Sequence, residues 1–364
     1  MFTFSRPPIA DILMYFTEYL SGWKRMAYTF AHHLVNNMKH PISSSFRNSR
    51  LAVEAAGLVK HFGSNKAVNG VDLSIEAGCI YGVLGPNGAG KTTTISMLST
   101  LLRPDGGHAA IFGYDTVREA HIVRQLIGLT GQYASVDEKL SATENLFLFA
   151  RLLGLSRKDA RKKAAELLEA FDLTEAAKRP LSKFSGGMRR RLDLAASLIA
   201  RPPLIFLDEP TTGLDPRTRL QMWDTIRQLV ASGSTVLLTT QYLEEADQLA
   251  DRIAVIDSGQ VIAEGTPAEL KASIGVAALE LQLRSSDHVQ TAHDIIRQML
   301  GADCHVSPEG MITAPLADPG LITDVLLALR NHQIDLLEVS VKSPTLDEVF
   351  MAITGKEKQK LINA

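Results

Sequence analysis

The amino-acid sequence predicts an α/β protein that carries a helical subdomain and ends in a small α+β domain. Three observations support this fold class. Short, almost continuous apolar runs alternate with helical patterns over residues 51–274, as expected for parallel strands that are buried on both faces. A long stretch of helical spacing interrupts this alternation. A shorter region, residues 275–355, then shows its own order of strands and helices.

Length and composition exclude several other classes of protein. The chain has 364 residues, of which 45% are hydrophobic and 21% charged, and its formal net charge is −2. These values are typical of a globular protein with about two domains. No run reaches the ~18 consecutive apolar residues that a membrane-spanning helix needs. Because the chain is nearly neutral, we do not expect nucleic acid as a partner. The two cysteines, Cys79 and Cys304, are too few for a four-thiolate metal site.

Residues 1–50 form an N-terminal extension with a composition of its own. The extension holds six Lys and Arg residues against two acids, and it is rich in aromatic residues. The stretch from Ile12 to Val35 fits an amphipathic basic helix that can lie on a membrane surface; a disordered tail is the alternative. No cleavable signal peptide is indicated, because no adequate apolar stretch precedes a small-residue cleavage site. Residues 356–364 are expected to form a short tail.

The central region supplies the candidate strands of the predicted sheet. Four apolar runs are expected to be buried strands: Ile80 to Leu84, Leu204 to Leu207, Thr235 to Thr239 and Ile253 to Ile256. Between the first two runs, residues 133–185 carry apolar side chains at helical spacing throughout. That stretch is the predicted helical subdomain.

The C-terminal region predicts a small domain with the order β-α-β-β-α-β. Two segments alternate like half-buried strands, one at Leu279, Leu281 and Leu283 and the other at Leu337, Val339 and Val341. Amphipathic helical patterns at Val289 to Met299 and at Leu321 to Leu329 lie between them, with the turn Pro308-Glu309-Gly310 separating the two helices. This order is typical of a split βαβ domain.

A glycine-rich motif between the first apolar run and a helical segment predicts a phosphate-binding loop. It matches G-x-x-x-x-G-K-[ST], the P-loop pattern, in Gly85, Pro86, Asn87, Gly88, Ala89, Gly90, Lys91 and Thr92, with Thr93 following in the helix. The glycines allow successive N–H groups to point at phosphate oxygens, and the helix adds its positive N-terminal end. We expect Lys91 to reach the β- and γ-phosphates of a nucleoside triphosphate and the Thr92 hydroxyl to bind Mg²⁺.

Two carboxylates follow the apolar run that ends at Leu207. Asp208 is placed to hold Mg²⁺, and Glu209 is placed to accept a proton from the attacking water or to orient it. An inert, solvated acidic pair at the end of a strand is the alternative interpretation. The P-loop in the same chain favours the catalytic one.

A second candidate anion site lies between these two motifs. Ser185, Gly186 and Gly187 open a helical segment and offer a hydroxyl, unhindered N–H groups and a helix N-terminus, although a plain helix cap would use the same residues. The order of P-loop, Gln132, Ser-Gly-Gly, acidic strand and Gly213-Leu214-Asp215 resembles the ATP-binding subunit of ABC transporters. The resemblance covers about Leu51 to Ser273.

This resemblance implies that ATP and Mg²⁺ are bound and that two subunits, arranged head to tail, hold two ATP molecules between them. Phe62 resembles the aromatic residue on which adenine stacks, and Gln132 resembles the glutamine that reaches Mg²⁺. Ser185 and Gly187 resemble the groups that close over the γ-phosphate bound by the opposite subunit. Asp215 resembles the loop acid at the dimer contact. The chain is therefore expected to form a homodimer.

One residue departs from the family pattern. The family usually has a histidine where this chain has Gln241, which can donate a hydrogen bond but cannot become a cation near neutral pH. The run from Thr239 to Ala250 and the sequence Leu-Asp-Glu-Val-Phe at 346–350 resemble the daunorubicin-resistance type of exporter ATPase, in which glutamine is a known variant. We therefore interpret Gln241 as a native residue of the catalytic site.

The resemblance implies an ATPase that powers the export of a hydrophobic drug, antibiotic or lipid. A separate membrane-spanning subunit would carry the compound, contacting the segment 133–144, and this chain would lie at the cytoplasmic face of the cell membrane as a peripheral subunit. An importer ATPase is an alternative, against which the C-terminal region argues. A soluble ABC ATPase acting on nucleic acid or the ribosome is another; a single P-loop and the lack of a coiled-coil or zinc insertion argue against it. A P-loop kinase or GTPase would leave the Ser-Gly-Gly motif without a role.

Overall fold

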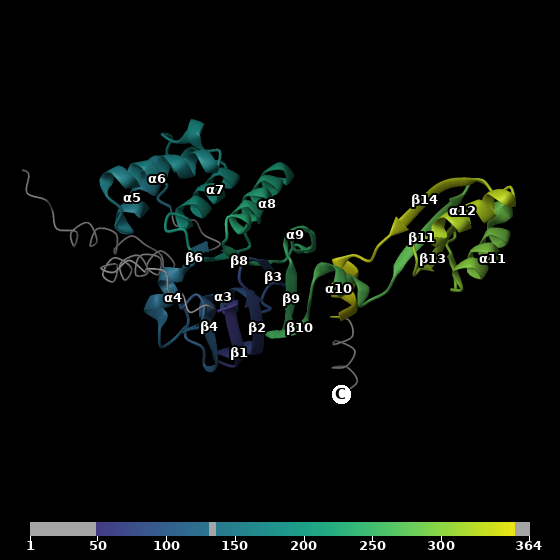
Figure 1. Ribbon diagram of the computed structural model, residues 1–364, viewed down its shortest axis with the longest axis horizontal. Helices are drawn as coiled ribbons and strands as arrows, with labels where there is room; N and C mark the ends of the chain where they lie inside the picture. Colours follow the sequence, from purple (N-terminus) through teal and green to yellow (C-terminus); the bar gives the residue numbers. More distant parts are fainter. Residues whose placement is uncertain (1–48, 131–135, 354–364) are drawn as a thin grey trace, which may run out of the picture. The chain divides into compact units, whose positions relative to one another are not determined.

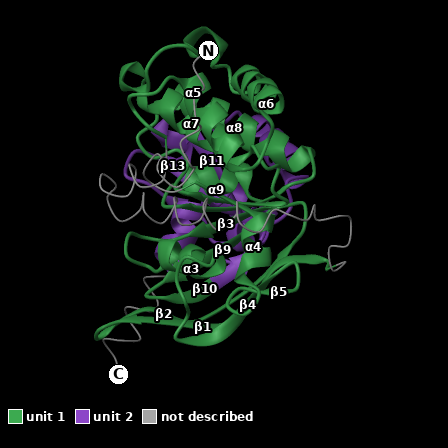
Figure 2. Cartoon of the chain, turned by 90° about the vertical axis from the view of Figure 1, so that its left-hand side faces the viewer, with its two compact units in different colours: residues 1–262 green, residues 263–364 purple. Residues whose placement is uncertain are grey.

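The computed structural model describes residues 49–130 and 136–353. Most of the predicted N-terminal extension, Gln132 and the predicted tail lie outside these residues. The chain divides into two compact units, residues up to Ile262 and residues from Ala263 (Figure 2). The division falls inside strand β10 (Gln260–Gly265), whereas the sequence predicted a boundary at 274. Helix α10 (Pro267–Ala272) follows β10.

A six-stranded sheet forms the centre of the first unit, with the strand order β10-β9-β3-β8-β7-β6 (Figure 1). Strand β3 pairs in parallel with β8 and β9, and β7 pairs in parallel with β8 and β6. Each of the four apolar runs predicted as strands lies in this sheet, and the α/β fold class is confirmed. The strands other than β10 are β3 (Ile80–Leu84), β6 (Ile127–Thr130), β7 (Leu204–Asp208), β8 (Thr235–Thr240) and β9 (Arg252–Asp257).

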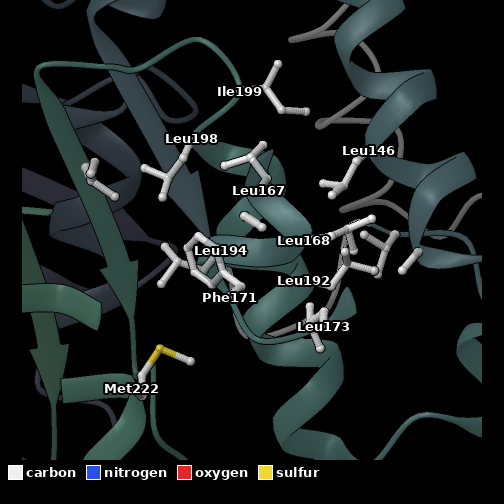
Figure 3. Close-up of a cluster of buried hydrophobic side chains, with 14 of the residues drawn as sticks. Leu146, Leu167, Leu168, Phe171, Leu173, Leu192, Leu194, Leu198, Ile199 and Met222 are labelled. Carbon is white, nitrogen blue, oxygen red and sulfur yellow. The ribbon is translucent and has the colours of Figure 1, made fainter. Parts of the chain in front are cut away.

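Alternate side chains of the central sheet enter two separate hydrophobic cores. Ile205 and Leu207 face a core shared with helices α5 (Ala142–Leu152), α6 (Arg157–Ala170), α7 (Gly186–Ser197) and α8 (Pro216–Ala231), part of which is drawn in Figure 3. Leu204 and Phe206 face the other core, with helices α3 (Lys91–Leu98) and α4 (Ala120–Leu126). Burial of each such side chain stabilises the fold by roughly 1.5–3 kcal/mol. The helices of the two cores lie on opposite faces of the sheet (Figure 1).

An antiparallel sheet with the strand order β2-β1-β4-β5 completes the second core. Its strands are β1 (Leu51–Phe62), β2 (Asn65–Glu76), β4 (Gly106–Ile111) and β5 (Tyr114–Asp115). No strand was predicted in residues 51–76 or 106–115. In β1, Gly57 has a φ of 59° and the register shifts between Ala55 and Leu58, so the strict alternation that signals a strand is lost.

The prediction that residues 133–185 are helical throughout was wrong. Helices α5 and α6 account for part of the described stretch, and Ser141 begins α5 in a capping box with Glu144. Residues 171–185 contain only two short 3₁₀ helices, η1 (Thr174–Ala176) and η2 (Leu181–Lys183). Asp172 has a φ of 53° and Pro180 has no N–H to donate, so an α-helix cannot continue through this stretch.

The second unit contains an antiparallel sheet with the order β12-β13-β11-β14. Leu279, Leu281 and Leu283 of β11 are buried in a core against the two helices of the unit. Along the chain the elements are β11 (Ala277–Leu283), η3 (Ser286–His288), α11 (Val289–Leu300), β12 (His305–Val306), β13 (Met311–Leu316), α12 (Leu321–Asn331) and β14 (Leu336–Lys342). Residues 346–353 are helical.

One detail of the predicted C-terminal domain was wrong. Leu337, Val339 and Val341 are not half-buried: their exposed fractions are 64%, 40% and 45%. The physical reason is that β14 lies at the edge of its sheet and pairs, among the described residues, only with β11.

Helix α9 (Leu243–Leu249) is the remaining helix of the first unit among the described residues. Over residues 49–130 and 136–353, no helix combines the length and the apolar character required to cross a membrane.

Truncation after Ser273 should leave a fragment that folds and binds nucleotide, because β11, α11, α12 and β14 build a core of their own. We expect the dissociation constant for ATP to change by less than about threefold, or ~0.7 kcal/mol. Fluorescence titration with a labelled ATP analogue and thermal unfolding of the fragment measure this. A fragment that aggregates or loses nucleotide binding would show that the second unit is part of the first unit's fold.

Candidate functional site

The P-loop joins β3 to α3, and its backbone is packed too closely for side chains at two positions. A Cβ atom at Gly85 would lie 2.2 Å from the carbonyl oxygen of Ile256, and one at Gly90 would lie 2.4 Å from the carbonyl oxygen of Ala67. Gly90 also has a φ of 104° at the N-cap of α3. Glycine is therefore required at both positions by close approach of neighbouring strands. Ala89 is buried between them.

Lys91 is held inside the loop that it follows. Its side chain is 5% exposed, and its Nζ donates hydrogen bonds to the carbonyl oxygens of Gly85 (2.7 Å) and Pro86 (3.0 Å). Burial lowers the pKa of Lys91, while the nearby carboxylates of Glu209 and Asp208 oppose that shift. The ammonium group thus sits in the P-loop with negative charge beside it.

Thr92 and Asp208 come together from α3 and the end of β7. The Thr92 Oγ1 lies 3.1 Å and 3.2 Å from the two carboxylate oxygens of Asp208. Thr239 of β8 donates its hydroxyl to Asp208 Oδ1 at 2.5 Å. A hydroxyl and a carboxylate side by side provide the oxygen ligands that Mg²⁺ prefers. These residues therefore fit a magnesium ion, whereas Gln132, the third predicted ligand, lies outside the described residues.

Glu209 continues from β7 in an unusual backbone conformation. Its φ is 49°, a left-handed conformation that costs about 1 kcal/mol or more for a residue with a side chain. The structure holds it there: the Glu209 N–H donates to the Thr239 carbonyl oxygen (3.1 Å), and the Thr212 hydroxyl donates to Glu209 Oε2 (3.2 Å). Glu209 Oε1 lies 3.8 Å from Lys91 Nζ. The predicted base is thus fixed beside the P-loop lysine.

Gln241 lies at the same edge of the sheet. It directly follows β8 and is half-buried. The register pairs Thr240 with Leu84 and Thr239 with Asp208. Because these strands are parallel, the residues that follow them leave the sheet at one edge, where ligands bind in open α/β folds. Gln241 therefore leaves the sheet at the same edge as the P-loop and Glu209.

Phe62 ends β1 and is 52% exposed, with Lys60 Nζ 5.9 Å from the centre of its ring. A core position for this aromatic side chain is therefore excluded. Phe62 pairs with Asn65 at the start of β2, and β2 also carries Ala67, the residue that packs against Gly90 of the P-loop. Its contact with adenine stays a prediction.

Helix α7, whose N-cap is Ser185, lies on the other face of the central sheet from α3, which begins at Lys91 (Figure 1). Ser185 is the N-cap of α7 and accepts a hydrogen bond from the Met188 N–H at 3.2 Å, and it is exposed. Helix α7 packs in the core with α5 and α6, whereas Lys91 begins α3 in the other core (Figure 1). Among the described residues, the hydrogen bond of the Ser185 side chain is made within α7 and not with the P-loop.

Gly187 and Asp215 are linked through one threonine. A Cβ atom at Gly187 would lie 2.4 Å from the Cγ2 of Thr218 on α8. Asp215 is the N-cap of α8 and accepts from both the N–H (3.0 Å) and the hydroxyl (2.6 Å) of Thr218. The hydrogen bonds from Thr218 lower the pKa of Asp215. Packing within one chain is thus a sufficient reason for glycine at 187, and the predicted nucleotide and dimer contacts of both residues stay predictions.

Arg190 is a further residue of the site, and no sequence motif indicated it. From α7, its guanidinium donates to three successive carbonyl oxygens of the loop after β7: Asp208 (2.7 Å), Glu209 (3.1 Å) and Pro210 (3.1 Å). Arg190 therefore connects the helix that begins with Ser185 to the backbone that carries the two predicted catalytic carboxylates. The run of three arginines at 189–191 looks like a solvated face, and only its position on a capped helix near the acidic strand could have drawn attention to it.

Glu245 on α9 was also missed. It is fully buried and accepts hydrogen bonds from the Thr211 hydroxyl (2.8 Å) and from Trp223 Nε1 (3.3 Å). Burial raises the pKa of Glu245 above its ordinary value of 4.5. Thr211 comes two residues after Glu209 in the loop that follows β7. The hydrogen bond from Thr211 to Glu245 therefore holds this part of the loop against α9. An acidic residue next to another acid on a helix gave no sign of burial.

Comparisons with known proteins show which family the chain resembles. Residues 68–212 match the ABC transporter family. The chain is 53% identical over 305 residues to the daunorubicin/doxorubicin resistance ATP-binding protein DrrA of Streptomyces peucetius, covering 84% of this chain and 92% of that protein. It is 36% identical over 318 residues to the linearmycin resistance ATP-binding protein LnrL of Bacillus subtilis, covering 84% of this chain and 98% of that protein.

The fold of the first unit also matches a solved structure. A dimeric ATP-binding cassette in a post-hydrolysis state, bound to ADP and phosphate, superposes with a TM-score of 0.54 at 27% sequence identity. The match covers 59% of this chain and 98% of that chain.

Arg190→Ala should lower the turnover number for ATP hydrolysis by about tenfold or more, because hydrogen bonds from a charged donor contribute about 1.5–3 kcal/mol. The KM for ATP should change little, since the P-loop is untouched. Steady-state phosphate release measures both constants. Arg189→Ala is the matched control, because Arg189 pairs with the largely exposed Glu138. Normal turnover by a folded Arg190→Ala variant would contradict the positioning role.

Glu245→Gln should alter the pH dependence of stability. A carboxyl whose pKa is raised by folding binds its proton more tightly in the folded chain, so the free energy of unfolding falls as pH rises from about 4.5 towards the raised pKa. The wild-type value minus the Glu245→Gln value should therefore decrease with increasing pH. Denaturant unfolding between about pH 4.5 and about pH 8 measures this difference. Glu244→Gln, at an exposed neighbour, should show no such decrease, and a flat or rising difference for Glu245→Gln would refute the assignment.

Proposed function

The chain belongs to the family of daunorubicin/doxorubicin resistance ATP-binding proteins of ABC transporters, and from this premise we propose that it hydrolyses ATP to export hydrophobic compounds through a separate membrane-spanning subunit. The observation that carries the proposal is the cluster of Lys91, Thr92, Asp208 and Glu209 at one edge of the central sheet. These residues come from the start of α3 and the end of β7 and provide a cation, oxygen ligands and a base within a few ångströms.

Each residue of this cluster has a chemical task in ATP hydrolysis. Lys91 exchanges its hydrogen bonds to loop carbonyls for bonds to the β- and γ-phosphate oxygens and neutralises part of their charge. Glu209 orients the attacking water and accepts its proton, and its fixed backbone limits the motion that this step requires. Thr92 and Asp208 would hold Mg²⁺, which supplies further positive charge to the phosphate oxygens when bound. Gln241 donates a hydrogen bond to the γ-phosphate.

A second copy of the chain is proposed to complete the site. Ser185 is exposed, and α7, which it caps, lies across the sheet from α3, which supports a contact with the nucleotide of another subunit. The likeness to a dimeric cassette bound to ADP and phosphate supports the same arrangement. In this proposal Ser185 and Gly187 close over the γ-phosphate, Asp215 lies at the dimer contact and Phe62 stacks on adenine. ATP closes the dimer, and loss of phosphate opens it.

The membrane partner and the compound exported are inferred from the relatives. The two curated relatives described above are named for resistance to daunorubicin, doxorubicin and linearmycin, which supports a hydrophobic drug or antibiotic as the compound. The described part of the segment 133–144, from Val136, and the preceding Gln132 are the proposed contact with the membrane subunit. The chain would work at the cytoplasmic face of the membrane, where ATP is present. No observation favours the importer alternative.

Glu209→Gln should reduce phosphate release by about a hundredfold or more while ATP binding is retained, because the amide cannot accept the proton from water. With ATP bound and not hydrolysed, the variant should accumulate as a dimer. Size-exclusion chromatography with light scattering, with and without ATP, measures the oligomeric state. Undiminished phosphate release would remove Glu209 as the base.

Adding Ser185→Arg to Glu209→Gln tests whether Ser185 of one subunit contacts the ATP that is bound by the other subunit. The double variant should bind ATP through its own P-loop but remain monomeric. Ser182→Arg, at an exposed serine three residues earlier, is the matched control and should still dimerise. If the Ser185→Arg double variant dimerises as well as the control, the proposed sandwich is wrong.

A further inference from the structure

Strand β14 presents an apolar edge that no described element covers. Leu337, Val339 and Val341 alternate along it and are 64%, 40% and 45% exposed. These are three of the nine large hydrophobic side chains identified as exposed on the described chain. The register pairs Val339 with Leu281 and Val341 with Leu279, so both valines extend the helix-covered face of the sheet. A free edge with apolar side chains favours pairing with another strand.

The opposite face of β14 carries charge. Glu338, Ser340 and Lys342 pair with Gln282, Glu280 and Ala278 of β11. Lys342 Nζ lies 2.7 Å from a Glu280 carboxylate oxygen, and the Ser340 hydroxyl donates to the same oxygen at 3.3 Å. Thus one strand has an apolar row on one face, and on the other an acid and a base that lie symmetrically about Ser340.

This pattern is complementary to a second copy of itself. When two identical strands pair antiparallel about a two-fold axis, residues directly opposite each other lie on the same face. With the axis at Ser340, Glu338 lies opposite Lys342 of the other copy, and Val339 lies opposite Val341 of the other copy. The acid then lies opposite the base and the two valines lie opposite each other, whereas Leu337, at the register shift of β14, lies opposite Ser343. Moving the axis by one residue to Val339 keeps an apolar match, with Leu337 opposite Val341, but it places Glu338 opposite Ser340 and breaks the charge pairs. The charge pairs therefore decide between the two registers.

We propose that β14 pairs antiparallel with β14 of a second copy of this chain, with the two-fold axis at Ser340, so that the two C-terminal sheets form one continuous sheet. A pair of seven-residue strands buries less surface than the ~1,200 Å² of a stable interface, so the contact is weak by itself. The strand pairing rests on the proposed function, because the nucleotide sandwich holds two chains together and so raises the effective concentration of the two β14 strands. The pairing itself requires no nucleotide.

Cysteine cross-linking of the full chain tests the register. Cys79 and Cys304 are first replaced by serine, and Ser340→Cys is then oxidised with and without ATP. Directly opposed Cβ atoms lie about 4.5–5.5 Å apart, close enough for a disulfide with small adjustments. Leu337→Cys is the matched control: it is on the same strand and well exposed, but two copies of residue 337 would lie about 20 Å apart. We expect a cross-linked dimer from Ser340→Cys and little from Leu337→Cys.

Charge reversal tests the same pairing without relying on one disulfide. In the Ser340→Cys background, Glu338→Lys and Lys342→Glu should each reduce the cross-linking rate by about threefold or more, because each creates two like-charge pairs. The combination of both should restore the rate. Lys342→Glu also loses the contact with Glu280, but so does the combined variant. Recovery of the cross-linking rate in the combined variant therefore reports only the charge pair between residue 338 of one copy and residue 342 of the other.

The outcomes separate this inference from the proposed function. Equal cross-linking at positions 337 and 340, or no recovery in the combined variant, overturns the β14 pairing. If Glu209→Gln dimerises with ATP while Ser340→Cys does not cross-link in either state, the strand pairing is wrong and the nucleotide sandwich stands. If Ser340→Cys cross-links specifically but Glu209→Gln does not dimerise with ATP, the sandwich fails and the strand pairing stands.

Discussion

The parallel hydrogen bonding of β3, β8 and β7 is the constraint on which the site depends. It sets Leu84 beside Thr240 and Asp208 beside Thr239, so that a P-loop, an acidic pair and Gln241 all leave the sheet at one edge. Thr239 reinforces this register with its own side chain, because its hydroxyl donates to Asp208 while its carbonyl accepts from Glu209. A shift of one residue between these strands would turn every side chain to the opposite face and disperse the site.

Charge burial at this edge is tolerated because the groups are paired. Lys91 and Glu209 are both largely buried and lie 3.8 Å apart. Lys91 also donates to two carbonyl oxygens of the P-loop, and Glu209 accepts from the Thr212 hydroxyl. An isolated buried charge would cost several kcal/mol. The folded chain thus keeps a cation and a base in place before any nucleotide arrives, which is the preorganisation that electrostatic catalysis requires.

The loop after β7 is held from two directions. Arg190 contacts its carbonyl oxygens from α7, and Glu245 binds Thr211 from α9. Helix α7 begins at Ser185, so a contact made there by a second subunit would reach the catalytic carboxylates through one helix and one side chain. This gives a physical route by which closing a dimer can influence hydrolysis. The second unit has its own core, and within residues 263–353 the outer edge of β14 has no partner strand.

The sequence by itself determined the local chemistry. The P-loop, the acidic pair and the four buried strands have short-range signatures, because a glycine loop, a capped helix and an apolar run each depend on residues that are close together in the chain. The order of motifs was enough to indicate the family. The antiparallel strand β1 was missed, because a bulge at Gly57 disrupts the alternation from which strands are recognised.

Only the tertiary structure decided which of these residues meet. Arg190 and Glu245 gave no signal because their partners are backbone carbonyls and a buried hydroxyl from other elements. Leu337, Val339 and Val341 have the alternation of a half-buried strand, yet they are exposed, since burial depends on whether another element covers the strand. The periodicity of a sequence indicates which side chains share one face of a strand or helix. Which element packs against that face depends on contacts between segments that are distant in the sequence, and these contacts form only when the whole chain folds.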